Sequence, residues 1–424
     1  MSHSVLIPIG QLRIGMFVQL DLGWMNHPFP VSSFRIATVE QLASLRTLGV
    51  AHLRVVPDKS DPDFSLSLAA AQDVSVPLGH EPEPVVMAGG LLAPALAQHN
   101  DALQNCERSF GLATQDYQRI TEMVADEPAQ ALALGQALVG ACVDELLEQG
   151  DSVIRLLSED VGVRSAQHSV NVMVLCLLLG RALQLPGGDL RALGLAALLH
   201  DIGKQRLPLH VREPYAHLKA QDMARYCSHV AASVSIAEQM QLPREVVQAI
   251  AQHHERTDGS GFPMRLQGVA LGRYGQMLAL VNHYDRLCNP SHGAAAMTPH
   301  EALSMLFAQC QTQFDPALLG TFIRMMGVYP PGSVVQLLND RYAIVVAVNA
   351  ARPLRPRVVL YEPQQSKEQA QVINLENHPE LGIRRSLRPA QLPREVLDYL
   401  SPRRRICYFF ERAVGVGATQ GWGT

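Results

Sequence analysis

The sequence is short of charge and of aromatic side chains: 17% of its 424 residues are charged, 5% are aromatic, and the formal net charge is −4. A general nucleic-acid-binding protein is expected to carry an excess of positive charge, so this balance argues against nucleic acid as a partner. The seven cysteines include no Cys-x-x-Cys pair. An odd number of scattered cysteines argues against a disulfide framework or a zinc ribbon, and it predicts reduced thiols in a cytoplasmic protein.

Long hydrophobic segments are also missing. The longest apolar run in the middle of the chain, residues 172–179, has eight residues, whereas a transmembrane helix needs about 20. The first residues have neither the basic start nor the long apolar core of a secretion signal. We therefore expect no membrane span and a cytoplasmic location.

Length and composition predict a globular protein of two or three domains, since 47% of the 424 residues are hydrophobic. Changes of pattern along the chain divide it into five segments. They are a small α+β N-terminal domain (1–60), a linker rich in Pro, Ser, Asp and Gly (61–94), a helical connector (95–157), a helical domain (158–329) and a small β-rich C-terminal domain (330–424). The predicted fold class is therefore mainly α, with a helical bundle as its core.

Hydrophobic periodicity and capping residues predict the individual elements. In the first segment we expect strands over 5–9, 16–20 and 52–56 and a helix from Thr38 to Gly49. In the helical domain we expect helices over 166–184, 189–201, 219–240, 243–254, 271–288, 299–310 and 315–326. Asp189 is the predicted N-cap of the second of these helices, and Pro243 suits the first turn of the fourth. In the last segment, strands are expected over 333–338, 341–349 and 357–361.

The heptapeptide 198–204, Leu-Leu-His-Asp-Ile-Gly-Lys, closes one of these apolar helices. His200 and Asp201 then lie at a helix C-terminus, and Gly203 suits the left-handed cap that ends such a helix. An adjacent imidazole and carboxylate can reach the same metal ion. The pair alone is more simply explained as the polar tip of a capped core helix.

Further histidines change this interpretation. Polar residues interrupt or end the other apolar helices, and they are His168, His229, His253, His254 and Asn282. A buried imidazole needs a partner, and five of them with one aspartate are difficult to explain as packing. Imidazoles with a shared carboxylate favour Fe, Mn, Zn or Ni over Mg. A carboxylate that bridges two ions is typical of two-metal hydrolases.

These residues stand in a recognisable order: His168, then His200-Asp201-Ile-Gly-Lys204, then His229, then 253–263 with the sequence His-His-Glu-Arg-Thr-Asp-Gly-Ser-Gly-Phe-Pro. The pattern resembles the HD-GYP branch of the HD phosphohydrolase superfamily and covers about residues 160 to 327. The resemblance implies an HD-type helical bundle that hydrolyses the bacterial messenger cyclic di-GMP, to the linear dinucleotide pGpG or to GMP, by a metal-bridged hydroxide. Residues 14–18, with Trp24 and residues 27–29, resemble the N-terminal domain often fused to such proteins.

The resemblance also implies a role for each residue. His168, His200 and Asp201 hold one divalent ion (Fe, Mn or similar), and Asp201 bridges to a second ion. The second ion is completed by His229, His253 and His254. Asp201 and Lys204 are the implied catalytic residues, with Lys204 facing a phosphate oxygen. The implied substrate or partner loop contains Arg256, Asp258, Gly259, Gly261, Phe262 and Pro263.

The sequence departs from the family pattern at several positions. Asn282 stands where the family has a ligand aspartate, and a neutral amide is a weaker ligand, so the first metal site should be weakened. Arg164 stands where some members have a glutamate for a third metal, and Phe262 replaces the signature tyrosine. After the Tyr284-Asp285 helix, where many members carry phosphate-binding arginines, this sequence offers His292. The arginine run 403–405 is more simply explained as a solvated surface than as a phosphate or partner site.

Three functions therefore stay open. The first is an active, metal-dependent cyclic di-GMP phosphodiesterase. The second is a degenerate receptor or scaffold that binds cyclic di-GMP or a diguanylate cyclase without turnover, which Asn282 and the missing arginines favour. The third is an HD phosphohydrolase that acts on another nucleotide. A homodimer is compatible with each of them.

Overall fold

The computed structural model describes residues 4–20, 33–36, 42, 45, 52–61, 92–148, 150–212, 219–290, 295–350, 353, 355–378 and 381–412. The chain divides into two compact units, 1–87 and 88–424. The predicted fold class is confirmed, because the chain is mainly helical with strands near its beginning and a sheet formed towards its end.

The first unit contains a four-stranded antiparallel sheet. Its strands are β1 (Val5–Pro8), β2 (Phe17–Gln19), β3 (Ser33–Arg35) and β4 (His52–Val55), in the order β1-β4-β2-β3. Alternation along β4 buries Leu53 and Val55 in one apolar core with Val18 of β2. The three predicted strands are confirmed, and β3 was not predicted. Most of the helix predicted over 38–49, most of the linker, and residues 24 and 27–29 lie outside the described residues.

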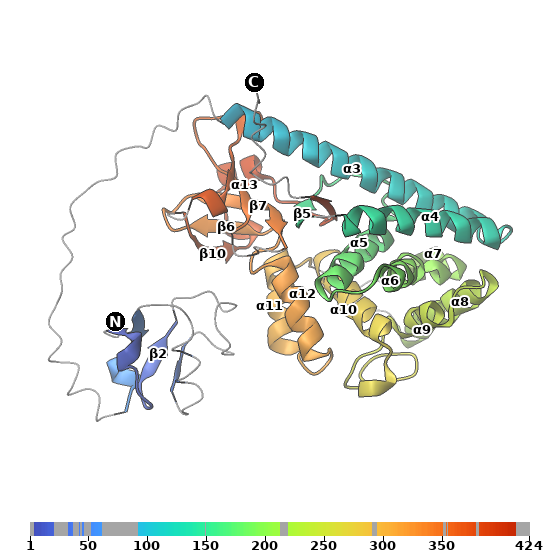
Figure 1. Ribbon diagram of the computed structural model, residues 1–424, viewed down its shortest axis with the longest axis horizontal. Helices are drawn as coiled ribbons and strands as arrows, with labels where there is room; N and C mark the ends of the chain where they lie inside the picture. Colours follow the sequence, from blue (N-terminus) through green and yellow to red (C-terminus); the bar gives the residue numbers. More distant parts are fainter. Residues whose placement is uncertain are drawn as a thin grey trace, which may run out of the picture. The chain divides into compact units, whose positions relative to one another are not determined.

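The second unit is built mainly of helices (Figure 1). They are α3 (Leu92–Met123), α4 (Pro128–Leu147), α5 (Gln167–Ala182), α6 (Gly187–Leu199), α7 (Leu209–Arg212), α8 (Ala220–Gln239), α9 (Arg244–Gln252), α10 (Arg273–Cys288), α11 (Pro299–Gln309), α12 (Pro316–Met326) and α13 (Arg394–Leu400). Residues 169–180 of α5 are buried on every side, which places this helix at the centre of the bundle. It contacts α3, α4, α6, α10 and α12. The seven helices predicted for the bundle are confirmed to within a few residues.

Two predicted helix ends are wrong. α6 begins at Gly187, because the carbonyl of Pro186 already accepts a bond from Leu190 N at 3.0 Å, so Asp189 lies in the first turn and is not the N-cap. After α6 the chain does not turn left-handed at Gly203; it continues as a 3-10 helix, Ile202–Arg206. A Cβ at Gly203 would lie 2.4 Å from the His229 carbonyl oxygen, so glycine here permits close approach to α8.

Helix α4 is the one helix among the described residues that is long and apolar enough, by length and composition, to cross a membrane. Its buried residues lie on one side, from Ala131 to Leu146. Val139 packs against Gly194 of α6, where a Cβ would come within 2.7 Å of it. The apolar composition of α4 is therefore used at least partly for packing within the bundle.

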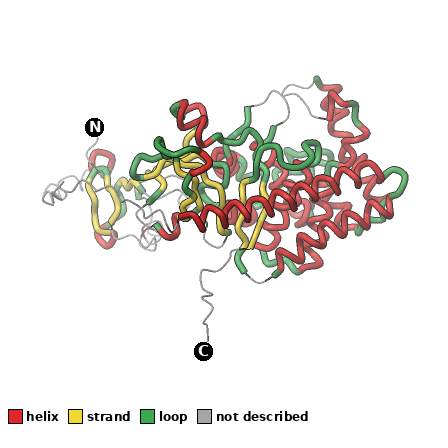
Figure 2. The backbone as a smooth tube through the Cα atoms, turned by 90° about the horizontal axis from the view of Figure 1, so that it is seen from above, coloured by secondary structure: helices red, strands yellow, loops and turns green. Residues whose placement is uncertain are grey.

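The second unit also contains a seven-stranded antiparallel sheet. Its strands are β5 (Ser152–Leu156), β6 (Val334–Leu337), β7 (Tyr342–Asn349), β8 (Arg357–Leu360), β9 (Val372–Asn374), β10 (Ile383–Leu387) and β11 (Tyr408–Arg412). The main order is β10-β6-β7-β5-β11, with β8 paired to β7 and β9. In Figure 2 these strands gather at one end of the unit and most of its helices at the other.

Strand β5 corrects the predicted domain boundaries. The sequence predicts a helical connector over 95–157, but residues 152–156 within it form β5, and all five are buried in the sheet. β5 lies between β7 and β11, which both come from the predicted 330–424 domain. The boundaries at 158 and 330 therefore do not separate folding units, because the sheet joins both ends of the second unit.

Candidate active site

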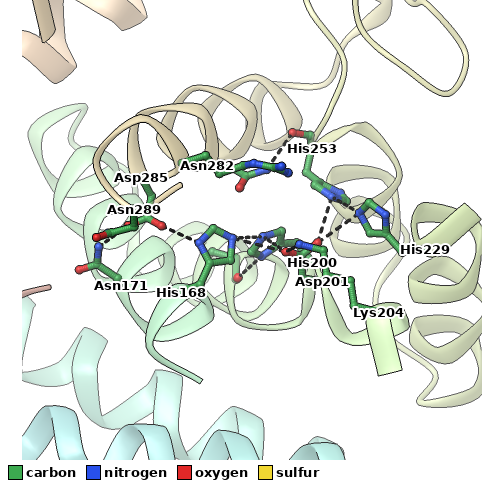
Figure 3. A network of polar contacts seen from close by, with 12 residues as sticks. His168, Asn171, His200, Asp201, Lys204, His229, His253, Asn282, Asp285 and Asn289 are labelled. Atoms are coloured by element: carbon green, nitrogen blue, oxygen red, sulfur yellow. Dashed lines mark hydrogen bonds and ion pairs between the residues drawn. The ribbon is translucent and has the colours of Figure 1, made fainter. Parts of the chain in front are cut away.

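The structure brings the six predicted histidine and aspartate ligands together. His168 lies in the first turn of α5, His229 lies within α8, and His200 with Asp201 follow directly after α6. His253 and His254 follow directly after α9. All except His168 are buried, and the His168 side chain is 26% exposed. Figure 3 shows His168, His200, His229 and His253 converging on Asp201.

The two carboxylate oxygens of Asp201 face two different sets of imidazoles. Oδ2 lies 3.4 Å from His168 Nε2 and 3.3 Å from His200 Nε2, and these two nitrogens are 3.2 Å apart. Oδ1 lies 3.2 Å from His229 Nε2 and 3.6 Å from His253 Nε2, which are also 3.2 Å apart. His254 completes the second group. Ligands of one ion at about 2.1 Å are roughly 3.0–3.4 Å from each other, so both groups have the spacing of a metal site.

Hydrogen bonds fix the direction of each ring. The Nδ1 atoms of His200 and His253 donate to the free last-turn carbonyls of Ala197 at 2.7 Å and Ile250 at 2.6 Å. His229 Nδ1 donates to the Tyr226 carbonyl in the same way. With the proton on Nδ1, each Nε2 presents a lone pair to the centre of the cluster. No proton then lies between the facing Nε2 atoms of His229 and His253, which are 3.2 Å apart. A cation bound by both lone pairs explains this short distance.

The charge states of the cluster also suit cations. Burial lowers the pKa of His200, and it lowers the pKa of His253 to about 3, so these imidazoles are neutral near pH 7. Burial alone would raise the pKa of Asp201, but the Lys204 ammonium and His200 hold it well below its usual range. The site therefore offers neutral imidazoles at His200 and His253 beside one ionised carboxylate.

Three buried polar atoms at the cluster have no hydrogen-bond partner among the described residues. They are Asp201 Oδ1, His254 Nε2 and Asn282 Oδ1. Buried polar atoms are nearly always paired, so three neighbouring orphans that can all act as ligands indicate a place for an ion. The cluster can therefore hold a divalent metal, as predicted.

Asn282 lies on α10 and faces the cluster (Figure 3). Its Nδ2 is 3.5 Å from the carbonyl oxygen of His253, and this leaves Oδ1 as the unpaired atom. The structure thus brings Asn282 to the predicted ligands and leaves its oxygen free to bind a cation.

Asp285, one helical turn further along α10, orients His168. Its Oδ2 accepts a hydrogen bond from His168 Nδ1 at 2.6 Å, and its Oδ1 accepts from Asn171 at 2.5 Å and Asn289 at 2.9 Å. Burial lowers the pKa of His168, but its bonds to Asp201 and Asp285 outweigh this and raise it. The sequence did not predict this orienting role of Asp285.

The network continues into the C-terminal part of the chain. Asn289 Oδ1 accepts from Ile406 N at 2.8 Å, and Asn171 Oδ1 accepts from Tyr408 N at 2.7 Å. The backbone at the start of β11 therefore fixes the side chains of Asn289 and Asn171, and these two side chains donate hydrogen bonds to Asp285. The sequence carried no signal for this contact, because its partners are more than 100 residues apart.

Lys204 lies next to the Asp201 carboxylate, and its predicted contact with a phosphate oxygen stays a prediction. Its Nζ contacts Asp201 Oδ2 and lies 5.5 Å from the centre of the Tyr226 ring. Arg286 of α10 donates to the Tyr226 hydroxyl and lies 5.4 Å from the same ring centre. Tyr226 thus positions two cations beside the cluster, and neither Tyr226 nor Arg286 was predicted.

A cleft of about 590 Å³ opens beside His168 and Asp201. One wall comes from α3, and the others come from the start of α5, from 201–212, from the end of α10 and from the segment before β11. Its lining includes Tyr117, Glu122, Arg164, His168, Asp201, Lys204, Arg212, Asp285, Arg286, Asn289 and Arg405. The cleft is therefore lined by polar and cationic side chains where it meets the cluster.

None of the six predicted loop residues lines this cleft. Arg256 is directed inward, 3.2 Å from His283 Nδ1 and 4.9 Å from the centre of the Phe314 ring. Asp258 Oδ1 accepts from Ser260 N at 2.9 Å within the loop. Phe262 stacks on His254, with 4.4 Å between ring centres. In the described contacts, Arg256 and Asp258 therefore shape the loop, and Phe262 supports the His254 ring.

The glycines of the loop are required by its backbone. Gly259 has a left-handed φ of 78°, and a Cβ at Gly261 would lie 2.5 Å from the His254 carbonyl oxygen. Glu255, which was not singled out, anchors the loop by accepting bonds from Met264 N at 2.7 Å and Leu266 N at 2.9 Å. Pro263 is exposed, and His292 lies outside the described residues.

Comparison with known proteins agrees with this site. Residues 120–318 match the family described as HD domain, and residues 4–134 match a domain of unknown function, DUF3391. A cyclic di-GMP phosphodiesterase of Pseudomonas aeruginosa is 28% identical over 85% of this chain and 86% of its own length. A 3'3'-cGAMP-specific phosphodiesterase of Vibrio cholerae is 27% identical over 49% of this chain and 38% of its own length.

Two further proteins are similar to this chain over part of its length. The cyclic di-GMP phosphodiesterase response regulator RpfG of Xanthomonas campestris is 28% identical over 46% of this chain and 53% of its own length. A solved HDG"Y"P protein of Bdellovibrio bacteriovorus covers 76% of this chain and 98% of its own, with a TM-score of 0.42 and 16% identity. Residues 120–318 therefore match the HD domain family, and the ordered histidine and aspartate motifs are consistent with its HD-GYP branch.

Proposed function

We propose that this protein is a metal-dependent phosphodiesterase that hydrolyses cyclic di-GMP. The observation that carries the proposal is the position of Asp201, whose two oxygens each face a separate group of imidazole Nε2 atoms. The names of the relatives support phosphodiester hydrolysis, and the relative matched over most of both chains is named for cyclic di-GMP. The cysteines, all of them free thiols, support a cytoplasmic location, where such a messenger is found.

In this proposal His168, His200 and Asp201 hold one divalent ion, and Asp201 with His229, His253 and His254 holds a second. Imidazole and carboxylate ligands suit Fe or Mn. When bound, the ions supply Lewis acidity and lower the pKa of water. Asn282 would offer the first ion a neutral oxygen where a carboxylate would bind more tightly.

The chain's own residues do the remaining work. The Nδ1 bonds of His200 and His253 keep their Nε2 atoms pointing inward, and Asp285 does the same for His168. Lys204 lines the cleft beside Asp201, where its ammonium can donate to a phosphate oxygen. Arg286, held by Tyr226, adds a second fixed positive charge on the same side. These groups would orient the phosphodiester without rearranging.

A second function is favoured by Asn282. If the first ion binds too weakly, the protein is a receptor that binds cyclic di-GMP without turnover. The expected diguanylate cyclase partner and homodimer stay predictions.

The test is hydrolysis of cyclic di-GMP by full-length protein loaded anaerobically with Fe(II) or Mn(II), with products separated by chromatography. We expect pGpG or GMP, and loss of both activity and metal in Asp201→Ala. Asp160→Ala, which changes an exposed aspartate, is the control. Binding without turnover would select the receptor, turnover of 3'3'-cGAMP alone would change the substrate, and unchanged metal in Asp201→Ala would exclude the bridging role.

A further inference from the structure

The cleft contains more positive charge than the histidine cluster needs. Its cationic side chains are Arg164, Lys204, Arg212, Arg286 and Arg405. Lys204 is engaged with Asp201, Arg286 with Tyr226, and Arg212 donates to the carbonyls of Leu207 at 2.8 Å and Gln205 at 2.6 Å. Arg164 and Arg405 form no ion pair or hydrogen bond through their side chains with any described residue. Two guanidinium groups in this cleft are therefore available to a ligand.

Among the described residues, no carboxylate of the cleft forms an ion pair with either of these two arginines. The carboxylates of the lining are Glu122, Asp201 and Asp285. Asp201 and Asp285 are taken up by the cluster, and Glu122 accepts a hydrogen bond from Gln118 at 2.9 Å. An anion in the cleft would therefore meet two guanidinium groups that no described carboxylate pairs with.

The backbone on both sides of Arg405 is fixed. Arg404 N donates to Glu159 at 3.4 Å, and Ile406 N donates to Asn289 at 2.8 Å. Arg405 itself is half-buried. Arg164 occupies the turn before α5, where Val163 N donates to Thr114 Oγ1 at 2.9 Å. The two arginines lie far apart in the sequence of the second unit. The backbone next to each of them is fixed by hydrogen bonds.

We infer that Arg405 and Arg164 bind the second phosphodiester of a cyclic dinucleotide while the first lies at the histidine cluster. The inference rests on the proposed function and deepens it, because it assigns a substrate-binding role to the C-terminal segment. A cyclic dinucleotide carries two phosphodiesters in one ring, so both must enter the cleft together. Planar guanidinium groups suit the paired oxygens of a phosphodiester. These two arginines would supply the contacts that are missing after α10.

The experiment compares two substrates that differ in phosphate number. Full-length, Mn(II)-loaded protein is assayed with cyclic di-GMP, which has two phosphodiesters, and with bis(4-nitrophenyl) phosphate, which has one. For Arg405→Ala we expect KM for cyclic di-GMP to rise about tenfold, the scale of one lost charge-assisted hydrogen bond, with kcat changed less than twofold. Arg164 is exposed, so Arg164→Ala should raise KM about threefold. KM for bis(4-nitrophenyl) phosphate should not change.

The matched control is Arg404→Ala, an exposed neighbour that does not line the cleft. Arg405→Lys, which keeps the charge, should recover part of the affinity, and an unchanged melting temperature excludes misfolding. Equal KM values for Arg405→Ala and Arg404→Ala on cyclic di-GMP would overturn the inference and leave the proposed function standing.

If the wild type hydrolyses neither substrate, the proposed activity fails, and equilibrium binding of cyclic di-GMP decides the inference. Weaker binding by Arg405→Ala would support it. Equal binding by both proteins, or no binding by either, would overturn it.

Discussion

Asp285 accepts a hydrogen bond from Nδ1 of His168 over 2.6 Å. This bond sets the direction of the His168 ring, which is partly exposed. The Nδ1 atom of His168 is held by a side chain and not by a backbone carbonyl. Three of the other rings are held by backbone carbonyls of their own helices. The orientation of His168, and with it the group of His168, His200 and Asp201, thus depends on the Asp285 side chain. His229 and His253 of the other group are oriented by backbone carbonyls.

Replacing Asp285 by asparagine should therefore weaken the first group selectively. The amide keeps the size of the side chain but removes the charge and one acceptor, and loss of such a supporting carboxylate typically costs 10–100-fold in metal affinity. We expect about one ion per chain at limiting metal, measured by elemental analysis. The control is Asp398→Asn, on the surface of α13. Wild-type metal content in Asp285→Asn would show that His168 is oriented by something else.

Asn282→Asp should have the opposite effect. An anionic oxygen binds a divalent cation more tightly than a neutral amide oxygen, and the two side chains have the same shape. The weak 3.5 Å contact from Nδ2 to the His253 carbonyl is the interaction lost. We expect metal content to approach two ions per chain and, in an active enzyme, turnover to rise. Asn339→Asp, in an exposed turn, is the control. No change in either quantity would mean that Asn282 is not at a ligand position.

A fragment covering 95–330 should not reproduce the second unit. The predicted segment bounds would make this fragment independent of the C-terminal domain. The fragment nevertheless lacks both neighbours of β5 and the Ile406 and Tyr408 backbone that holds Asn289 and Asn171. We expect low solubility or reduced metal content, and recovery of both in a fragment of residues 88–412. Equal melting temperatures and metal content for the two fragments would show that the sheet does not support the site.

His99 should make stability fall in mild acid. It is buried, and Arg155 Nη1 donates to its Nδ1 at 2.9 Å. Burial and the charge of Arg155 lower the pKa of His99 from 6.5 to about 4. Because the folded value is the lower one, the unfolded chain binds more protons once the pH falls below 6.5. The free energy of unfolding is then lost progressively down to about pH 4.

Between pH 7 and pH 5 this loss should be on the order of 1–2 kcal/mol. In His99→Gln the free energy of unfolding, measured by urea titration, should depend less on pH over this range. His210→Gln, which changes an exposed histidine, should behave like the wild type. The same pH dependence in all three proteins would contradict the prediction.

The helices and ligands of the bundle could be predicted because their signals are local. The long apolar run of α5, the apolar face of α8 and the proline just before α9 are each features of one short stretch of sequence. Each ligand lies in or next to a helix. The order of His168, His200-Asp201, His229 and His253-His254 then pointed to one site, which the structure assembles.

What the sequence could not show depends on contacts between distant segments. β5 is buried on both faces, so it lacks the alternation that marks a half-exposed strand, and an apolar run before a helical domain favours helix. The arginine run 403–405 was interpreted as a solvated surface. Only the folded chain brings Arg405 to the cleft, so the sequence carried no signal for this position. Tyr226 was missed because its role is to hold Lys204 and Arg286, and Arg286 lies 60 residues away.

Because β5 pairs with β7 and β11, which come much later in the sequence, the sheet can close only late during synthesis. β5 leaves the ribosome with α3 and α4, long before its partners β7 and β11 have been translated. The backbone of Ile406 and Tyr408, which fixes the amides around Asp285, emerges later still. The group formed by His168, His200 and Asp201 should therefore gain its full metal affinity only after Tyr408 has been translated, so the nascent chain has little capacity to capture an ion before the sheet closes.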